Sequence, residues 1–286
     1  MQSSIKTVAV IGAGTMGNGI AHVFAQKQFK VHLIDTNSAI LDKAINKITK
    51  NLDRQISKGI IDPADKDQSL LRISTFQSIE HGLEDVDLII EAATENSAIK
   101  KDIFKQMDQF AKANCILSTN TSSISITELA AVTNRPNKVI GMHFMNPVPV
   151  MKLVEIINGK ETNEATTNTI VDLTKTIDKI PCVVKDAPGF IANRILMPMI
   201  NEAIIAFSEG ISDAATIDQI MKLGMAHPMG PLQLADYIGL DVCKNILDIM
   251  HDGFGNHKYA PCSLLVQMVQ EGKLGVKSGE GFYKYN

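Results

Sequence analysis

The stretch Thr7-Val-Ala-Val-Ile11-Gly12-Ala-Gly14-Thr-Met-Gly17 decides the fold of this chain. A continuous apolar run, typical of a buried strand, leads directly into three glycines. Residues 18–28 then show the apolar spacing of a helix, and a second apolar run over 29–34 ends in Asp35. Strand, glycines, helix, strand and terminal acid in one unit predict a dinucleotide-binding βαβ fold, which an isolated G-x-G-x-x-G would not.

Each glycine of this turn meets a separate physical need. The first makes the tight turn, the second lets a pyrophosphate approach the backbone, and the third lets the helix pack on the strand. The helix N-terminus then offers N–H groups and a positive dipole to the phosphates. Asp35 is expected to bind a ribose diol and to repel a 2′-phosphate, which favours NAD over NADP. A purely structural glycine turn is the alternative.

Further strands and helices alternate along the chain as far as Val184. Apolar runs predict strands at 72–75, 87–93, 115–117, 138–142, 152–157 and 181–184, and helical spacing predicts helices at 38–58, 97–111 and 164–178. In an open parallel sheet, ligands bind outside the carboxyl ends of the strands. Glu95, Ser122 and His143 all follow strands or end them, so we expect them to share one edge of the sheet.

Beyond Lys185 the pattern changes to helices alone, predicted at 191–209, 214–223, 232–248 and 263–271. We therefore expect an α/β protein with a Rossmann-type domain over residues 1–185 and an all-helical domain over residues 186–286. The glycine-rich end, 272–283, carries lysines and on its own indicates a solvated tail.

A histidine and a glutamate lie on the two strands around the loop broken by Pro147 and Pro149. His143 ends the first strand and Glu155 lies inside the second, so a hairpin-like return would bring them side by side. A carboxylate beside one imidazole nitrogen fixes the tautomer and makes the other nitrogen a better base. A lone histidine near a strand end is, by contrast, usually structural.

The long helix 38–58 has an apolar stripe and, opposite to it, a stripe of cations that includes Lys50, Arg54 and Lys58. Solvated helix faces normally mix acids with bases, so the excess of bases favours contact with a phosphorylated ligand. An ordinary solvated face is the alternative.

Composition excludes several classes of protein. The 286 residues carry a formal net charge of −3, so no overall positive field attracts nucleic acid or an anionic membrane. No apolar run reaches membrane-spanning length, and the four scattered cysteines show no metal-ligand spacing. A strand that begins at Thr7 leaves no room for a signal peptide. We therefore expect a cytoplasmic protein without a metal site.

These motifs together resemble the L-3-hydroxyacyl-CoA dehydrogenase family, and within it the bacterial 3-hydroxybutyryl-CoA dehydrogenases. The resemblance covers essentially the whole chain. Besides the glycine turn, it depends on Asn120-Thr-Ser-Ser123, the long run from His143 to Glu155, Asp186-Ala-Pro-Gly-Phe-Ile-Ala-Asn-Arg194 and Gly279-Glu-Gly-Phe-Tyr283.

The resemblance implies roles for particular residues. His143 matches the catalytic base and Glu155 its partner, while Ser122 and Asn193 match polar residues around the reacting hydroxyl. Contacts with NAD are implied for Gly12, Ala13, Gly14, Thr15, Met16, Gly17, Asp35, Glu95, Lys100, Ser122, Asn146 and Lys277. Contacts with an acyl-CoA substrate are implied for Asn51, Lys58, Lys50, Arg54 and Ser122. A homodimer through the helical domain is also implied.

Two other functions stay open at this point. A dehydrogenase of a free hydroxy acid on the same fold would need a cationic clamp for the carboxylate and would have no use for the basic stripe. A non-catalytic NAD-binding protein would have no use for His143 and Glu155, and both residues are present.

Overall fold

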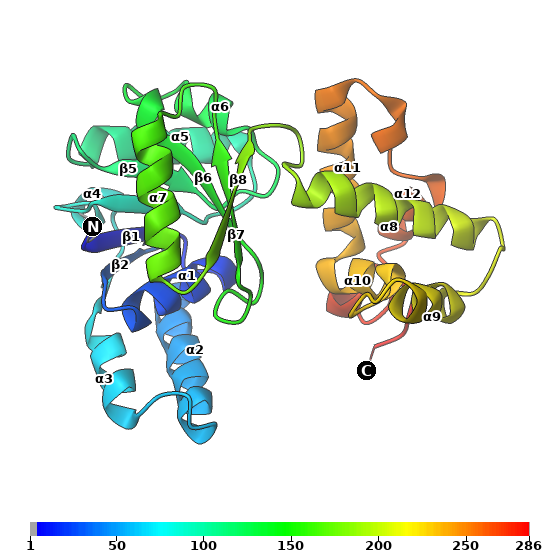
Figure 1. Cartoon of the computed structure of the whole chain (residues 1–286), viewed down its shortest axis with the longest axis horizontal. Helices are drawn as coiled ribbons and strands as arrows, with labels where there is room; N and C mark the ends of the chain where they lie inside the picture. The colour runs from blue at the N-terminus through cyan, green and yellow to red at the C-terminus, as the bar shows by residue number, and fades with distance from the viewer. Residues whose placement is uncertain (1–4, 286) are drawn as a thin grey trace. The chain divides into compact units, whose positions relative to one another are not determined.

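The computed structural model of the chain describes residues 5–285. The chain divides into two compact units, Met1–Asp186 and Ala187–Asn286. The first unit contains strands and helices in alternation, and the second consists of helices joined by loops (Figure 1).

The first unit is built around one eight-stranded sheet with the strand order β3-β2-β1-β4-β5-β6-β7-β8. All neighbouring strands are parallel except β6 and β7, which are antiparallel. The strands are β1 Thr7–Ile11, β2 Lys30–Ile34, β3 Ile73–Phe76, β4 Leu88–Glu91, β5 Ile116–Thr119, β6 Val139–Phe144, β7 Leu153–Asn158 and β8 Ile180–Lys185. The antiparallel pair is possible because only a short loop joins its strands.

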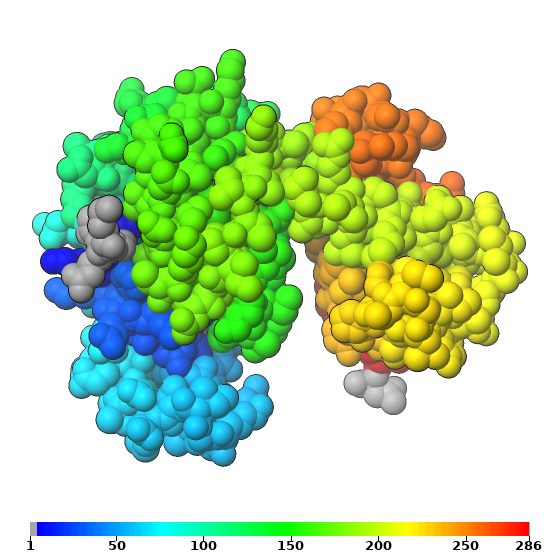
Figure 2. Space-filling model, viewed as in Figure 1, coloured from blue at the N-terminus to red at the C-terminus, as the bar shows by residue number. Residues whose placement is uncertain are grey.

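Helices cover both faces of this sheet. Side chains from α1 (Thr15–Gln26), α2 (Ser38–Ser57) and α7 (Glu164–Thr176) share one apolar core with the sheet, and α5 (Ser97–Phe110) and α6 (Ile126–Ala130) lie on the other face (Figure 1). The sequence pattern did not predict α3 (Pro63–Leu71), α4 (Ile79–Gly82) or α6. In the space-filling view, α2 and α3 form a lobe that protrudes from the rest of the first unit (Figure 2).

The long helix α2 is stabilised by a side-chain cap at its N-terminus and by burial of its apolar face. The Asn37 side chain caps the N-terminus by accepting a hydrogen bond from the Ala39 N–H. Leu41, Ile48 and Leu52 are buried along one side, so packing stabilises a helix that would be marginal in isolation. The basic residues of the predicted stripe therefore face away from the sheet.

The second unit is a helical cluster with its own core. Its helices are α8 Ala192–Ser208, α9 Ala214–Gly224, α10 Pro231–Ile238, α11 Leu240–Phe254 and α12 Ser263–Gln270. The single helix predicted over 232–248 was wrong, because Gly239 with a φ of 103° separates α10 from α11. Apolar spacing continues across Gly239 since both helices bury residues in the same core, and this continuity concealed the break.

The glycine-rich end of the chain packs against the second unit instead of forming a solvated tail. The buried carboxylate of Asp236 accepts hydrogen bonds from the N–H groups of Phe282 and Tyr283 and from the hydroxyl of Tyr285, at 2.9–3.0 Å. A Cβ on Gly281 would lie 1.9 Å from an Asp236 oxygen, so only glycine fits there. Sequence reasoning missed this contact, because Asp236 lies far from the glycines along the chain.

No helix among residues 5–285 is long and apolar enough to cross a membrane. All four cysteines are free thiols, and Cys182 is exposed, whereas Cys115 and Cys243 are buried.

His22 on α1 predicts a loss of stability in acid. The side chain is completely buried, neither ring nitrogen has a hydrogen-bond partner among the described residues, and burial lowers the pKa of His22 from 6.5 to about 4. The unfolded chain therefore binds more protons between pH 6.5 and 4, and the contribution of His22 to stability decreases as the pH falls through that window. At pH 5 this loss amounts to about 2 kcal/mol.

A His22→Leu variant should abolish this part of the pH dependence. We expect the difference in unfolding free energy between pH 7 and pH 5 to shrink in this variant, as measured by urea unfolding. Exposed His81 on α4 provides the matched control, since His81→Gln should leave the difference unchanged. An equal pH dependence in His22→Leu and in the unsubstituted protein would contradict the prediction.

Candidate active site

The glycine turn between β1 and α1 has the geometry that a bound dinucleotide needs. Gly12 has a φ of 96°, and a Cβ there would lie 2.7 Å from the Ala92 carbonyl oxygen. A Cβ on Gly17 would lie 1.7 Å from the Gly12 carbonyl oxygen, so the helix can approach the strand only without a side chain there. Among residues 5–285, nothing lies within 4 Å of a Cβ placed on Gly14, and no side chain caps α1. Open space above an uncapped helix N-terminus suits a pyrophosphate.

Asp35 follows β2 and holds the turn in place. One carboxylate oxygen accepts a hydrogen bond from the Ala13 N–H at 2.9 Å, and the other accepts one from the Asn37 N–H at 3.1 Å. The carboxylate therefore has a fixed position, with further lone pairs that can accept hydrogen bonds from a ribose diol. These residues fit NAD.

The fully buried carboxylate of Glu91, at the end of β4, lies close to the same edge of the sheet. It accepts hydrogen bonds from the Lys100 ammonium at 2.7 and 2.8 Å, from the Thr119 hydroxyl at 2.6 Å and from the Ala93 N–H at 2.7 Å. Lys100 itself is only 1% exposed. Sequence reasoning assigned Lys100 to the cofactor, but in the structure its ammonium is bound by Glu91.

Glu95 organises the loop that follows β5. Its Oε1 accepts hydrogen bonds from the Thr121 hydroxyl at 2.6 Å, the Ser123 hydroxyl at 2.9 Å and the Ser122 N–H at 3.0 Å. Lys100 Nζ lies 3.4 Å from the other oxygen. Burial alone would raise the pKa of Glu95, but the Lys100 charge and these hydrogen bonds outweigh burial and lower it. Glu95 is therefore a carboxylate that holds Ser122 in place.

His143 and Glu155 are directly opposite each other on the antiparallel strands β6 and β7. His143 Nδ1 lies 2.9 Å from Glu155 Oε2, and both side chains are buried. The Phe144 N–H, which follows His143, donates a hydrogen bond to the Asn120 side chain at 2.9 Å. This bond ties the end of β6 to the loop that carries Ser122, so the two segments share one edge of the sheet.

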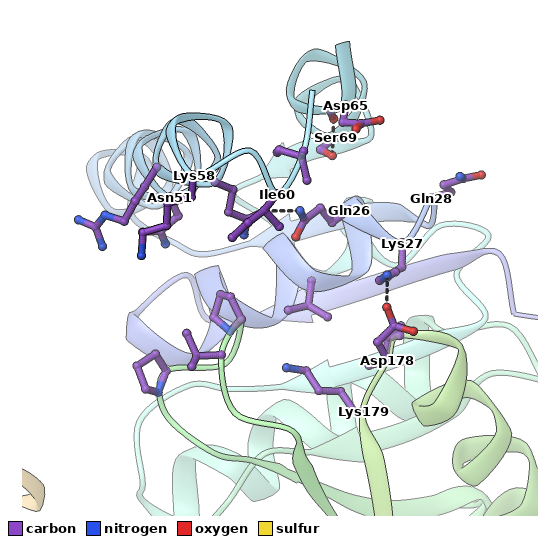
Figure 3. Close-up of a pocket in the computed structure, with 18 of the residues that line it drawn as sticks. Gln26, Lys27, Gln28, Asn51, Lys58, Ile60, Asp65, Ser69, Asp178 and Lys179 are labelled. Carbon is purple, nitrogen blue, oxygen red and sulfur yellow. Dashed lines mark hydrogen bonds and ion pairs between the residues drawn. The ribbon is translucent and has the colours of Figure 1, made fainter. Parts of the chain in front are cut away.

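A pocket of about 680 Å³ lies on the first unit between α2, the end of α1 and the loop after β6 (Figure 3). Asn51 and Arg54 line the pocket from α2, and Lys58 lines it from the position just after this helix. Lys50, which the basic stripe also includes, is exposed and does not line it. The pocket wall contains more basic than acidic side chains, which suits an anionic ligand.

Two of the predicted site residues belong to the second unit. Asn193 is buried on α8. Lys277, near the end of the chain, donates a hydrogen bond to Asp241 at 2.6 Å. Asn146 belongs to the first unit and is exposed in the loop between β6 and β7.

Both parts of the chain match models of one protein family. Residues 7–187 match "3-hydroxyacyl-CoA dehydrogenase, NAD binding domain", and residues 189–285 match "3-hydroxyacyl-CoA dehydrogenase, C-terminal domain". This chain belongs to the 3-hydroxyacyl-CoA dehydrogenase family.

Individual relatives agree with membership of the 3-hydroxyacyl-CoA dehydrogenase family. The probable 3-hydroxybutyryl-CoA dehydrogenase of Bacillus subtilis is 49% identical over 281 residues, which cover 98% of each chain. The 3-hydroxybutyryl-CoA dehydrogenase of Clostridioides difficile is 48% identical over 279 residues, with 98% of this chain and 99% of that protein covered. A crystal structure of (S)-3-hydroxybutyryl-CoA dehydrogenase from Ralstonia eutropha matches with a TM-score of 0.96 and 47% identity, and covers 99% of this chain and 100% of that one.

Membership of the 3-hydroxyacyl-CoA dehydrogenase family confirms three predictions. These are the α/β class with a Rossmann-type part followed by helices, NAD as the cofactor, and the oxidoreductase activity. The roles of the individual site residues stay predictions. Glu91 was missed, and the only signal for it was an acid at the end of a strand otherwise entirely apolar.

Proposed function

We propose that this protein interconverts (S)-3-hydroxyacyl-CoA and 3-ketoacyl-CoA with NAD, and that its main substrates are 3-hydroxybutyryl-CoA and acetoacetyl-CoA. The observation that carries the proposal is the buried His143–Glu155 pair, which lies on the same sheet as the NAD-binding turn. The names of the relatives support the choice of a short acyl-CoA substrate.

The geometry of the pair supports the proton chemistry that we propose. Because Nδ1 faces Glu155, the Nδ1–H donates to the carboxylate, and Nε2 is the ring nitrogen that carries the lone pair and can act as the base. His143 Nε2 removes the hydroxyl proton in oxidation and returns it in reduction. Glu155 stabilises the imidazolium that forms, as the carboxylate does in a catalytic triad. Bound NAD supplies the hydride acceptor, and NADH the hydride donor.

Polar groups complete the proposed site. Ser122, held by Glu95, would donate a hydrogen bond to the substrate oxygen where negative charge develops. We propose the same task for Asn193. Asn146 and Lys277 are proposed to contact the cofactor, while Lys100 contributes by holding Glu91 and Glu95.

The decisive experiment is NADH oxidation measured with three substrates: acetoacetyl-CoA, longer 3-ketoacyl-CoA thioesters and free acetoacetate. We expect the highest kcat/KM with acetoacetyl-CoA and a strong preference for NADH over NADPH. A higher kcat/KM with acetoacetate would favour the dehydrogenase of a free hydroxy acid. No turnover of any hydroxy or keto compound would favour the non-catalytic NAD-binding protein.

The pocket on α2 predicts how the CoA part is recognised. If Arg54 and Lys58 meet CoA phosphates, the Arg54→Gln/Lys58→Gln variant should raise KM for acetoacetyl-CoA about 3- to 30-fold at low salt, since each exposed ion pair contributes up to about 1 kcal/mol. Added salt should reduce the difference. Lys50→Gln should have a smaller effect, because Lys50 does not line the pocket.

Two controls distinguish phosphate recognition from general damage. Acetoacetyl-pantetheine lacks the CoA phosphates, so its KM should be the same for the double variant and the unsubstituted protein. Lys105→Gln removes an exposed cation from α5 and should leave both KM values unchanged. An unchanged KM for acetoacetyl-CoA in the double variant would mean that the basic stripe is an ordinary solvated helix face and does not bind CoA.

We also propose that the protein is a cytoplasmic homodimer. Exposed apolar side chains on and just after α9, namely Ile220, Leu223 and Met225, support self-association through the second unit. Light scattering of the purified protein would measure the mass directly.

A further inference from the structure

Lys179, which immediately precedes β8, is a buried cation that neither the cofactor turn nor the His–Glu pair uses. Its side chain is buried, and it lines the pocket of about 680 Å³ together with Asn51 (Figure 3). The ammonium donates hydrogen bonds to the carbonyl oxygens of Val148 at 2.5 Å and Met151 at 2.6 Å. Burial lowers the pKa of Lys179, Lys152 lowers it further, and Asp178 opposes the shift. Burying a lysine ammonium costs free energy, and its hydrogen bonds to the loop offset part of that cost.

Both carbonyl groups belong to residues 145–152, the loop between β6 and β7. Within this loop, the Pro147 carbonyl accepts hydrogen bonds from the N–H groups of Val150 and Met151, both at 3.0 Å. The Val148 and Met151 carbonyl oxygens instead accept hydrogen bonds from Lys179. The lysine therefore binds the loop at two points that local hydrogen bonds do not use.

Helix α1 holds the same loop from another side. A Cβ on Gly19 would lie 2.9 Å from Val148 Cβ, closer than real Cβ atoms approach, so the absence of a side chain lets Val148 pack directly on the helix. Val148 is 1% exposed as a result. The loop is thus confined between the Lys179 ammonium and the backbone of α1.

The position of this loop bears directly on the proposed catalytic pair. The last residue pair before the loop is Phe144 opposite Val154, and the next is His143 opposite Glu155. A shift of the loop is therefore transmitted over one residue to the Nδ1–Oε2 contact. Contacts of this kind lose efficiency when misplaced by as little as 1 Å.

We propose that Lys179 is a positioning residue for the reaction: by fixing the β6–β7 loop against α1, it holds His143 against Glu155. The inference rests on the proposed function, since it assigns the pair its catalytic role. Lys179 also lines the pocket that we assign to CoA, but its ammonium is bound by the two carbonyl groups of the loop, and it acts through them.

Two variants disturb the loop from its two sides. Lys179→Met removes the ammonium with little change in shape, and Gly19→Ala pushes Val148 from the α1 side without changing any charge. We expect each to lower kcat about 10- to 100-fold with acetoacetyl-CoA. The Kd for NADH, which depends on the Gly12–Gly17 turn and Asp35, should rise no more than about threefold in the same variants.

The pH profile separates positioning from two other roles. A looser Glu155 contact disfavours protonated His143, so the acid limb of the oxidation rate should move to lower pH in both variants. A purely electrostatic role of the Lys179 charge would move it to higher pH in Lys179→Met and leave Gly19→Ala unchanged. A merely structural role would lower Tm and leave kcat and the acid limb of the folded enzyme unchanged. Lys175→Met, an exposed lysine on α7, is the matched control and should change none of these values.

Each result supports or overturns the proposal. Unchanged kcat and an unchanged acid limb in either folded variant would overturn it, and if Lys179→Met does not fold, Gly19→Ala decides alone. An NMR titration of the His143 ring, assigned with His143→Gln, tests the same shift without turnover. Unsubstituted protein that oxidises no NADH with acetoacetyl-CoA would refute the proposed function, whereas the NMR result would still decide the role of Lys179.

Discussion

His143→Gln is expected to lower kcat about 10²- to 10⁴-fold, because the substitution removes the only base that the proposed mechanism uses. The Kd for NADH should stay within about twofold, since His143 lies outside the Gly12–Gly17 turn. Steady-state kinetics with acetoacetyl-CoA and fluorescence titration with NADH measure the two quantities. His81→Gln, an exposed histidine on α4, should keep full activity.

The partner of His143 is tested by a double-mutant cycle. Glu155→Gln keeps the imidazole but removes the charge that favours its protonated form, so it should also lose kcat and shift the acid limb of the oxidation rate to lower pH. If the two residues act as a unit, the double variant should be little worse than His143→Gln alone. Fully multiplicative losses would instead mean that Glu155 serves the substrate or the fold independently.

Lys100→Met is expected to destabilise the protein by about 3–5 kcal/mol, because it leaves the Glu91 carboxylate buried without its counter-charge. The Thr119 hydroxyl and the Ala93 N–H would still bind Glu91, but neither carries a charge. Thermal and urea unfolding measure the loss.

Neighbouring Lys101 provides a sharp control for this prediction. It also pairs with a glutamate, Glu128, but on the surface, where such a pair contributes at most about 1 kcal/mol. Lys101→Met should therefore cost far less than Lys100→Met. Adding Glu91→Gln to Lys100→Met should recover part of the loss, because the unpaired charge is then gone. Equal stability of the Lys100→Met and Lys101→Met variants would show that the buried pair contributes nothing.

The sequence alone determined the features that are formed by residues close together along the chain. The Gly12–Gly17 turn and the acid at the end of β2 were predictable because a strand, a tight turn and a helix N-terminus depend on neighbouring residues. His143 and Glu155 could be placed side by side for a similar reason: a short loop joins their strands, and hairpin pairing follows from that closeness. Family motifs then supplied the acyl-CoA substrate, which no periodicity could have shown.

Only the tertiary structure decided which charged side chains are buried and which groups they pair with. The family resemblance assigned Lys100 to NAD, and no motif singled out Lys179, yet Lys100 neutralises Glu91 and Lys179 binds two loop carbonyls. Gly239 likewise ends a helix inside an unbroken apolar pattern. The physical reason is common to these cases: hydrophobic periodicity reports which face of an element is buried, whereas the partner of a buried polar group is set by elements that pack together from distant parts of the chain.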